Sequence, residues 1–292
     1  MFLFREKSKS EDSTNGNSAF AALPYKKRLK QLETAINKSQ FTIYLQPIIN
    51  LSSWSIQGVE VLLRWRHPEY GLLTPDYFLS DLEKSGLINK VDPWVLKKAG
   101  HLNMYLTKCG LKPLRLAVNI SCVHLVEKSF LPQLDSLITK SGISPEFLEL
   151  EITDQCLFDN IDTQVNVLQK IRDKGIKLAL KYSISGLPIT IDLDRLPVDI
   201  INIDKELTHQ ITGNKENRQI MSTILTFSKT HQLEVVAEGI ETAEQLIFLN
   251  AMHCNAGQGF LLSHPSTIKD FTELYQSGKK FDYIIDKVSN KL

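Results

Sequence analysis

The sequence lacks the features that mark a secreted, membrane-spanning or nucleic-acid-binding protein. No apolar run approaches the roughly 20 residues that a membrane-spanning helix needs, and charged residues interrupt the opening MFLF too early for a signal peptide. Lysine and arginine number 34 against 33 aspartates and glutamates, so no net charge attracts nucleic acid or a membrane surface. We therefore expect a cytoplasmic protein with no membrane span and no nucleic-acid partner.

Cysteine is also scarce. The four cysteines are scattered along the chain and form no CxxC pair: Cys109, Cys122, Cys156 and Cys254. This spacing favours thiols buried in a reducing compartment over a metal site or a disulfide set.

Composition indicates a globular chain with a short polar lead. The chain has 292 residues, of which 42% are hydrophobic and 23% charged. Residues 7–19 are polar and rich in serine, asparagine and glycine, so residues 1–22 are predicted to be a disordered tail. Residues 23–40 are predicted to form a lead-in helix, 41–280 a single domain and 281–292 a C-terminal tail.

Within that domain, short apolar runs alternate with amphipathic stretches. The predicted strands are 41–49, 59–65, 114–120, 147–153, 176–182, 199–203, 233–239 and 257–263. Eight strands separated mainly by helices predict an α/β fold, a (β/α)8 barrel of the TIM type. A doubly wound open sheet is the alternative, although no GxGxxG follows any strand.

Polar residues interrupt or end several of these apolar strands. In a barrel, side chains at the C-terminal ends of strands converge on one mouth. The candidates are Gln46, Glu60, Asn119, Glu151, Glu238 and Gln258. Carboxylate and amide oxygens suit Mg²⁺ or Mn²⁺, whereas each glutamate taken alone is as well explained as a strand-end cap or an ion pair.

These residues also carry a family resemblance. From about residue 46 to 265 the chain resembles an EAL domain, the cyclic di-GMP phosphodiesterase fold, with the signature triplet reading Glu60-Val61-Leu62. The matching segments, in order, are YLQPI (44–48), GVEVLLRWRHPEYG (58–71), LAVNIS (116–121), LELEIT (148–153), RLPVDIINID (195–204), VVAEGIETAEQL (235–246) and GQGFLLSHP (257–265). The resemblance implies a modified barrel whose first strand is antiparallel to the others.

The resemblance further implies a catalytic site with two divalent cations that share a bridging water or hydroxide. Glu60, Asn119 and Glu151 match ligands of the first cation, and Glu238 matches a ligand of the second.

Three positions depart from the family pattern. Where the family has two adjacent aspartates, this chain has Lys181 and Tyr182, and Asn202 replaces the family's catalytic lysine. Three glutamates and Lys181 sum to −2, so two divalent cations would leave +2 in a partly desolvated pocket, which is costly. We expect a degenerate site without catalysis, with Lys181 as a counter-ion among the glutamates. No cofactor is then required. Of the vestigial ligands Glu60, Asn119, Glu151 and Glu238, the first three are expected to hold at most one Mg²⁺ or Mn²⁺, and the second site, at Glu238, is expected to be empty.

The residues that would hold nucleotide are better retained. Arg64 matches an arginine that contacts ligand phosphate, a role that suits a planar guanidinium; a surface salt bridge to Glu69 or Asp76 is its alternative. The positions that the resemblance associates with ligand are Gln46, Glu60, Leu62, Arg64, Asn119, Glu238, Glu241, Gln258 and Phe260. Phe260 has an equally good alternative as a core residue of the last strand.

Three hypotheses follow for the function. The first is an inactive cyclic di-GMP receptor that regulates a protein partner, and the second is a protein-interaction module that no longer binds nucleotide. The third is a weak phosphodiesterase. A homodimer is left open by the sequence.

Overall fold

The computed structural model describes residues 10–153, 156, 161–183, 196–278 and 281. Eight strands close into a barrel: β1 (Phe41–Asn50), β2 (Ile56–His67), β4 (Arg115–Asn119), β5 (Leu148–Thr153), β6 (Lys177–Tyr182), β7 (Ile200–Ile203), β8 (Glu234–Ala237) and β9 (Ala256–Gly257). A short strand, β3 (Gly71–Leu73), pairs antiparallel with the end of β2. β1 is antiparallel to both its neighbours, β2 and β9, whereas β2 and β4 through β9 are mutually parallel. The predicted barrel with an antiparallel first strand is confirmed.

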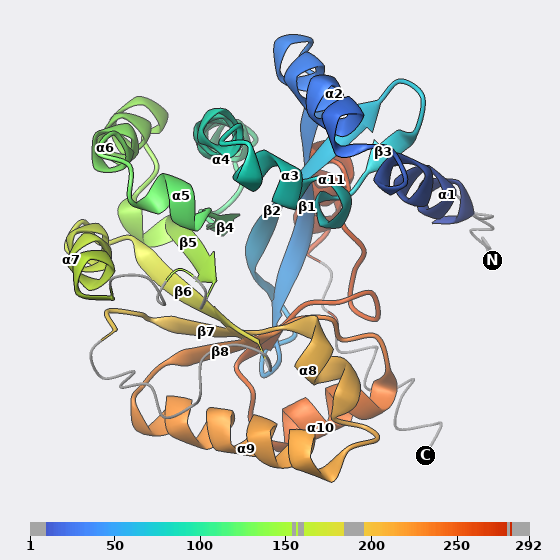
Figure 1. Ribbon diagram of the computed structural model, residues 1–292. Helices are drawn as coiled ribbons and strands as arrows, with labels where there is room; N and C mark the ends of the chain where they lie inside the picture. Colours follow the sequence, from blue (N-terminus) through green and yellow to red (C-terminus); the bar gives the residue numbers. More distant parts are fainter. Residues whose placement is uncertain (1–9, 154–155, 157–160, 184–195, 279–280, 282–292) are drawn as a thin grey trace.

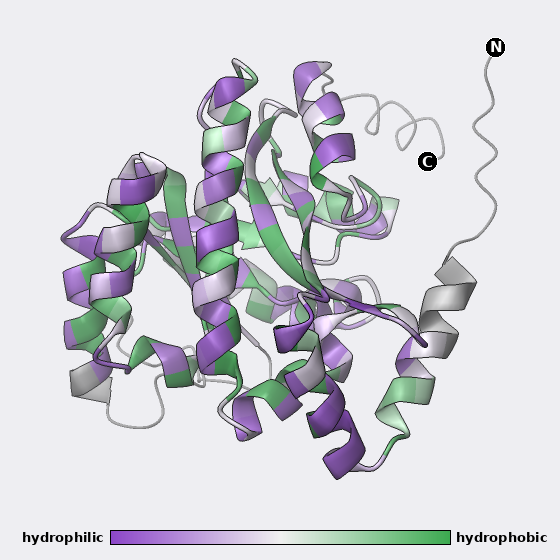
Figure 2. Cartoon of the chain, turned by 90° about the horizontal axis from the view of Figure 1, so that it is seen from above, coloured by the Kyte–Doolittle hydropathy of each residue, from purple (hydrophilic) through white to green (hydrophobic). Residues whose placement is uncertain are grey.

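Helices surround the ring of strands (Figure 1). They are α1 (Ser10–Ala21), α2 (Tyr25–Asn37), α3 (Leu79–Lys84), α4 (Ile88–Lys108), α5 (Cys122–Leu125), α6 (Phe130–Ser141), α7 (Ile161–Arg172), α8 (Lys205–Gln210), α9 (Lys215–Thr230), α10 (Ala243–Ala251) and α11 (Ile268–Gln276), with 3-10 turns at Pro75–Tyr77 and Pro145–Phe147. Hydrophobic and hydrophilic residues alternate around these helices, as Figure 2 shows. This amphipathic pattern lets one face of each helix pack on the barrel.

Two apolar layers stabilise the barrel. The inner layer is a small cluster contributed by six different strands: Ile48, Ala117, Ala179, Ile200, Val236 and Ala256. Small and branched side chains of this kind fill the interior of a barrel, so it is a packed core rather than a pore. The larger layer lies between strands and helices and includes the fully buried Trp65.

The N-terminal segment differs from its prediction. Residues 10–21, expected within a disordered tail, form helix α1, because Phe20 is fully buried and its ring lies 5.1 Å from that of Trp65. Asn17 is buried as well and accepts a hydrogen bond from the backbone N–H of Thr74 at 3.2 Å. Residues 1–9 and most of the predicted C-terminal tail lie outside the described residues.

The last strand and the cysteines also differ from expectation. The predicted strand 257–263 is wrong: β9 ends at Gly257, and the following residues form turns. Cys122 and Cys156 form a disulfide, with Cα atoms 4.9 Å apart, because they follow the neighbouring parallel strands β4 and β5. Cys254 is a buried free thiol as expected, whereas Cys109 is free but exposed. In the part of the chain that the structure describes, none of the helices has the length and apolar character needed to cross a bilayer.

Candidate functional site

A pocket opens at the C-terminal end of the barrel strands, and we call it the mouth pocket. It has a volume of about 420 Å³. Sequence-predicted residues from β1, β2, β4, β6 and the segments after β8 and β9 line it: Gln46, Glu60, Leu62, Arg64, Asn119, Lys181, Glu238, Glu241, Gln258 and Phe260. Glu151 and Asn202 lie beneath them, 2% exposed each, and Tyr182 ends β6 beside Lys181.

Strand register explains why these side chains meet. Gln46 of β1 lies opposite Glu60 of β2, and Asn119 of β4 lies opposite Glu151 of β5. Because alternate residues of a barrel strand point inward, matched positions on adjacent strands direct their side chains to the same space. The chain turns away directly after Glu238 at Gly239, whose φ of +70° favours glycine and whose added Cβ would lie 2.5 Å from Lys205.

The carboxylate of Glu60 is held by two amides. Asn119 Nδ2 donates to its Oε1 and Gln258 Nε2 donates to its Oε2, each at 2.7 Å. Both oxygens therefore have a neutral donor from the chain itself, and Glu60 is fixed although it is only 4% exposed.

The other two glutamates lie around the substituted positions. Lys181 Nζ lies 2.7 Å from Glu238 Oε2, so the lysine is the expected counter-ion, and Asn202 Nδ2 donates to Glu151 Oε1 at 2.8 Å. Four buried oxygens of this cluster accept no hydrogen bond from the described residues: Glu151 Oε2, Asn202 Oδ1, Glu238 Oε1 and Gln258 Oε1. Acceptors thus exceed donors, which favours a proton, water or a cation in this space.

The pKa values follow from burial and charge crowding. Burial and the neighbouring Glu60, Glu149 and Glu238 raise the pKa of Glu151 well above its usual range. Burial raises the pKa of Glu238 to about 7, although the nearby Lys181 ammonium opposes the shift. The pKa of Lys181 is raised because its attraction to the glutamates outweighs its desolvation, so it remains charged.

Two residues at the rim settle alternatives left by the sequence. Arg64 forms no surface salt bridge among the described residues: its Nη1 donates to Leu63 O at 2.8 Å, and its guanidinium lies 5.9 Å from the centre of the Tyr44 ring. Phe260 is 53% exposed and stacks on His264 with ring centres 4.4 Å apart, so it is not a core residue.

Several lining residues were not found from the sequence. Asp76, Leu79 and Lys205 border the pocket from outside the strands. Asp92, on α4, is 6% exposed and accepts hydrogen bonds from Ser121 N at 3.0 Å and Ser121 Oγ at 2.6 Å. Predicting site residues from the ends of strands cannot identify residues on helices, and no sequence motif indicates these four.

Comparison with known proteins identifies the family. The EAL domain model matches residues 29–265. The chain belongs to the EAL-domain family. It is 33% identical over 250 residues to the cyclic di-GMP phosphodiesterase NbdA of Pseudomonas aeruginosa, covering 85% of this chain and 32% of that protein. The chain thus spans about a third of the length of this curated relative.

Solved EAL structures have the same architecture. The PaMucR phosphodiesterase, in complex with c-di-GMP, superposes with a TM-score of 0.80 at 30% identity and covers 83% of this chain and 98% of that one. The EAL enzyme Bd1971, in its cAMP- and cyclic-di-GMP-bound form, gives a TM-score of 0.81 at 25% identity and covers 90% and 72%.

The side chains of this EAL domain do not fit a pair of divalent cations. The Lys181 ammonium contacts a carboxylate that the second cation would need, and a cation beside it would meet strong repulsion. Among the described side chains, no group of three or more His, Cys, Asp or Glu is arranged to hold a metal ion. Among the residues that match ligands of the first cation, Glu151 Oε2 accepts no hydrogen bond from the described residues.

Proposed function

We propose that this EAL domain is a receptor for cyclic di-GMP that binds the nucleotide without hydrolysing it. The single observation that carries the proposal is the contact of Lys181 with Glu238 inside a mouth pocket that is otherwise retained. The three replaced positions, 181, 182 and 202, belong to hydrolysis and are not among the positions associated with nucleotide.

Loss of hydrolysis follows from electrostatics. A pair of divalent cations would lower the pKa of a bound water and stabilise the charge that develops on phosphate. Lys181 supplies a single fixed positive charge and no ligand oxygen, and Asn202 offers a neutral amide that is already bonded to Glu151. Neither group forms hydroxide at neutral pH.

Retention of binding is supported by the remaining lining. Arg64 uses one nitrogen on Leu63 O, and among the described residues its other N–H groups make no hydrogen bond, so they suit a phosphate. Phe260 and Leu79 present exposed apolar surface at the rim, which suits stacking against a nucleobase. Nucleotide binding would then change the interaction of this domain with a regulatory protein partner.

A second function is favoured by a separate observation. Both Glu60 oxygens and one oxygen each of Glu151 and Glu238 already have donors from the chain, so the site is partly neutralised without any ligand. Such a site needs no ligand to balance its charges, which favours a nucleotide-independent interaction module as the second candidate function. Weak hydrolysis with one Mg²⁺ or Mn²⁺ at the vestigial ligands is the third possibility.

Calorimetric titration with cyclic di-GMP, in Mg²⁺ and separately in EDTA, distinguishes the three functions. The receptor predicts micromolar binding in both buffers and intact nucleotide afterwards. Linear product in Mg²⁺ would establish a phosphodiesterase, and absence of heat in both buffers would select the interaction module.

A matched pair of variants tests where the nucleotide binds. Arg64→Ala should weaken binding by about tenfold or more, the usual effect of removing a charge-assisted phosphate contact. Arg172→Ala removes the same charge from α7 beside Asp199, outside the mouth pocket, and should leave affinity unchanged. Equal effects would argue against binding in the mouth pocket.

A further inference from the structure

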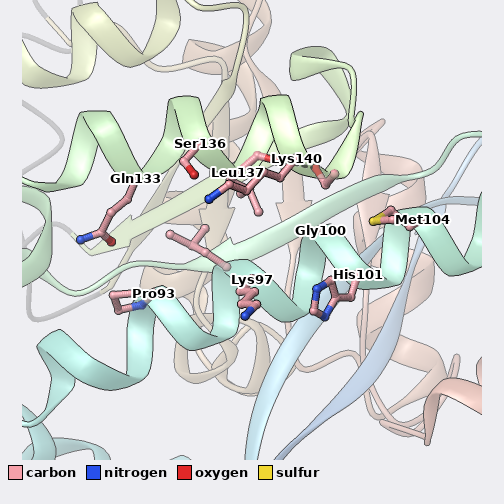
Figure 3. A pocket seen from close by; sticks show the side chains of 11 residues that line it. Pro93, Lys97, Gly100, His101, Met104, Gln133, Ser136, Leu137 and Lys140 are labelled. Carbon is pink, nitrogen blue, oxygen red and sulfur yellow. Dashed lines mark hydrogen bonds between the residues drawn. The ribbon is translucent and has the colours of Figure 1, made fainter.

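A second hollow lies outside the mouth pocket, on the outer surface between α4 and α6. We call it the α4–α6 groove; its volume is about 430 Å³ (Figure 3). On α4 the lining residues recur at positions 93, 96, 97, 100, 101 and 104, a helical stripe of about three turns and about 16 Å. On α6 they run from Gln133 to Ser141 with the same periodicity.

The floor of the groove is apolar and firmly packed. A Cβ added at Gly100 would lie 2.7 Å from Leu137 Cδ1 and 2.9 Å from Ser141 Cβ, so α6 rests directly on the glycine. Leu96 is 3% exposed, whereas Met104 is 37% exposed at one end of the groove. The groove therefore offers apolar surface to a ligand without any rearrangement of the helices.

The rim is cationic. Lys97 and Lys140 are exposed along it, and no acidic side chain lines the groove. Within the described residues these two lysines take part in no ion pair, in contrast to Lys174, which lies 2.6 Å from Asp135. An apolar floor between unpaired cations is complementary to an apolar ridge flanked by anions.

We propose that the α4–α6 groove docks an acidic amphipathic helix of a protein partner. The ridge of one helix packs into the depression between two others, and a length of three turns matches a few apolar anchors at helical spacing. Glutamates or aspartates on the flanks of that helix would face Lys97 and Lys140. Two lysines over an apolar floor are too few for a nucleic-acid backbone, which needs a longer basic surface.

The groove is linked to the mouth pocket by α4 and by a chain of side-chain contacts. Asp92, which lines the mouth pocket, bonds to Ser121 and lies 3.5 Å from His124 Nδ1. His124 Nε2 is 3.1 Å from Gln133 Oε1, and Gln133 lines the groove. The docking site thus shares a helix and a side-chain network with the nucleotide site, although docking itself requires no nucleotide.

A designed peptide tests the proposal on the full chain without nucleotide. The probe is a fluorescein-labelled, stapled helix of about five turns with leucine along one face and glutamate along both flanks; its twin has lysine in place of each glutamate. Fluorescence anisotropy should show the acidic helix binding at least about tenfold tighter than the basic twin. Lys97→Glu with Lys140→Glu should reverse that preference.

The control is Lys215→Glu with Lys229→Glu on α9, which changes the net charge equally at exposed positions away from the groove. It should leave the preference unchanged, and Met104→Glu should weaken acidic-helix binding. Circular dichroism melting confirms that each variant is folded. Equal binding of both peptides, or no response to the double reversal, overturns the proposal. The proposal is also overturned if the groove binds dodecanoate or anionic vesicles but not the peptide. Self-association of the protein that Lys97→Glu with Lys140→Glu abolishes would overturn it as well.

Discussion

The two ends of the barrel both carry a buried cluster of charged side chains, and the clusters are built differently. At the base, all three guanidinium nitrogens of Arg115 are used: Nε lies 2.7 Å from Glu149 Oε2, while Nη1 and Nη2 donate to Glu234 at 2.7 and 2.8 Å. At the mouth, Lys181 contacts Glu238 alone, and the hydrogen bonds to Glu60 and Glu151 come from neutral amides.

The difference separates a structural role from a binding role. A rigid arginine fork fixes two carboxylates at once, and Gln57 Nε2 adds a further bond to Glu234 at 2.6 Å. The mouth cluster instead lines a pocket, so its charges are arranged around space that a ligand can enter. Substitutions at the base should therefore lower the free energy of unfolding strongly. Substitutions at the mouth should lower it less and should change ligand binding instead.

The largest expected effect is from removing the cation at the base. Arg115→Met should lower the free energy of unfolding by about 3–5 kcal/mol, because two carboxylates lose their partner and Glu149 is fully buried. Lys181→Met at the mouth should cost only about 1–2 kcal/mol, since only Glu238 loses an ion-pair partner there. Urea unfolding of both variants measures the contrast, and equal losses would contradict it.

The next effect should come from the disulfide, which joins the segments after β4 and β5 at the mouth end. Cys122→Ser with Cys156→Ser should cost about 2–4 kcal/mol, since the bond closes a loop with a sequence separation of 34. Hydrogen exchange should quicken in α5 and stay unchanged in β8. Cys109→Ser, at the exposed free cysteine, is the control and should have no effect. Uniform loosening of both ends would show that the bond does not act locally.

The barrel could be predicted from the sequence because its signals are local. Each parallel strand is a short run of branched apolar residues, and the polar residues that interrupt or end these runs, Glu60, Asn119, Glu151 and Glu238, are readily recognised in the sequence. The position of Lys181 beside Glu238 likewise follows from the alternation of side chains in β6.

Other features depend on partners that are distant in sequence. Phe20 is buried because Trp65 lies against it, and Cys122 meets Cys156 because β4 and β5 are adjacent; neither pairing has a local signal. β9 ends early because the chain turns after Gly257, although the apolar run continues in the sequence. The α4–α6 groove could not be predicted from the sequence, because it is formed by residues of two helices whose packing against each other has no local signal.

The smallest expected effect contrasts two lysines of the same strand, one at each end of the barrel. Lys181→Asp replaces the counter-ion of Glu238 with a ligand oxygen, so the mouth should gain a site for Mn²⁺. At a tenfold excess of Mn²⁺ over the dissociation constant, stability should rise by about 1.4 kcal/mol. Lys177→Asp makes the same change of charge at the base, where Lys177 lies 3.6 Å from Asp199, and should gain nothing. Electron paramagnetic resonance of free Mn²⁺ and thermal melting measure both variants. If both variants bound Mn²⁺ equally, the added negative charge alone would explain the binding. If only Lys181→Asp bound the ion, a single lysine would account for the loss of the second cation site.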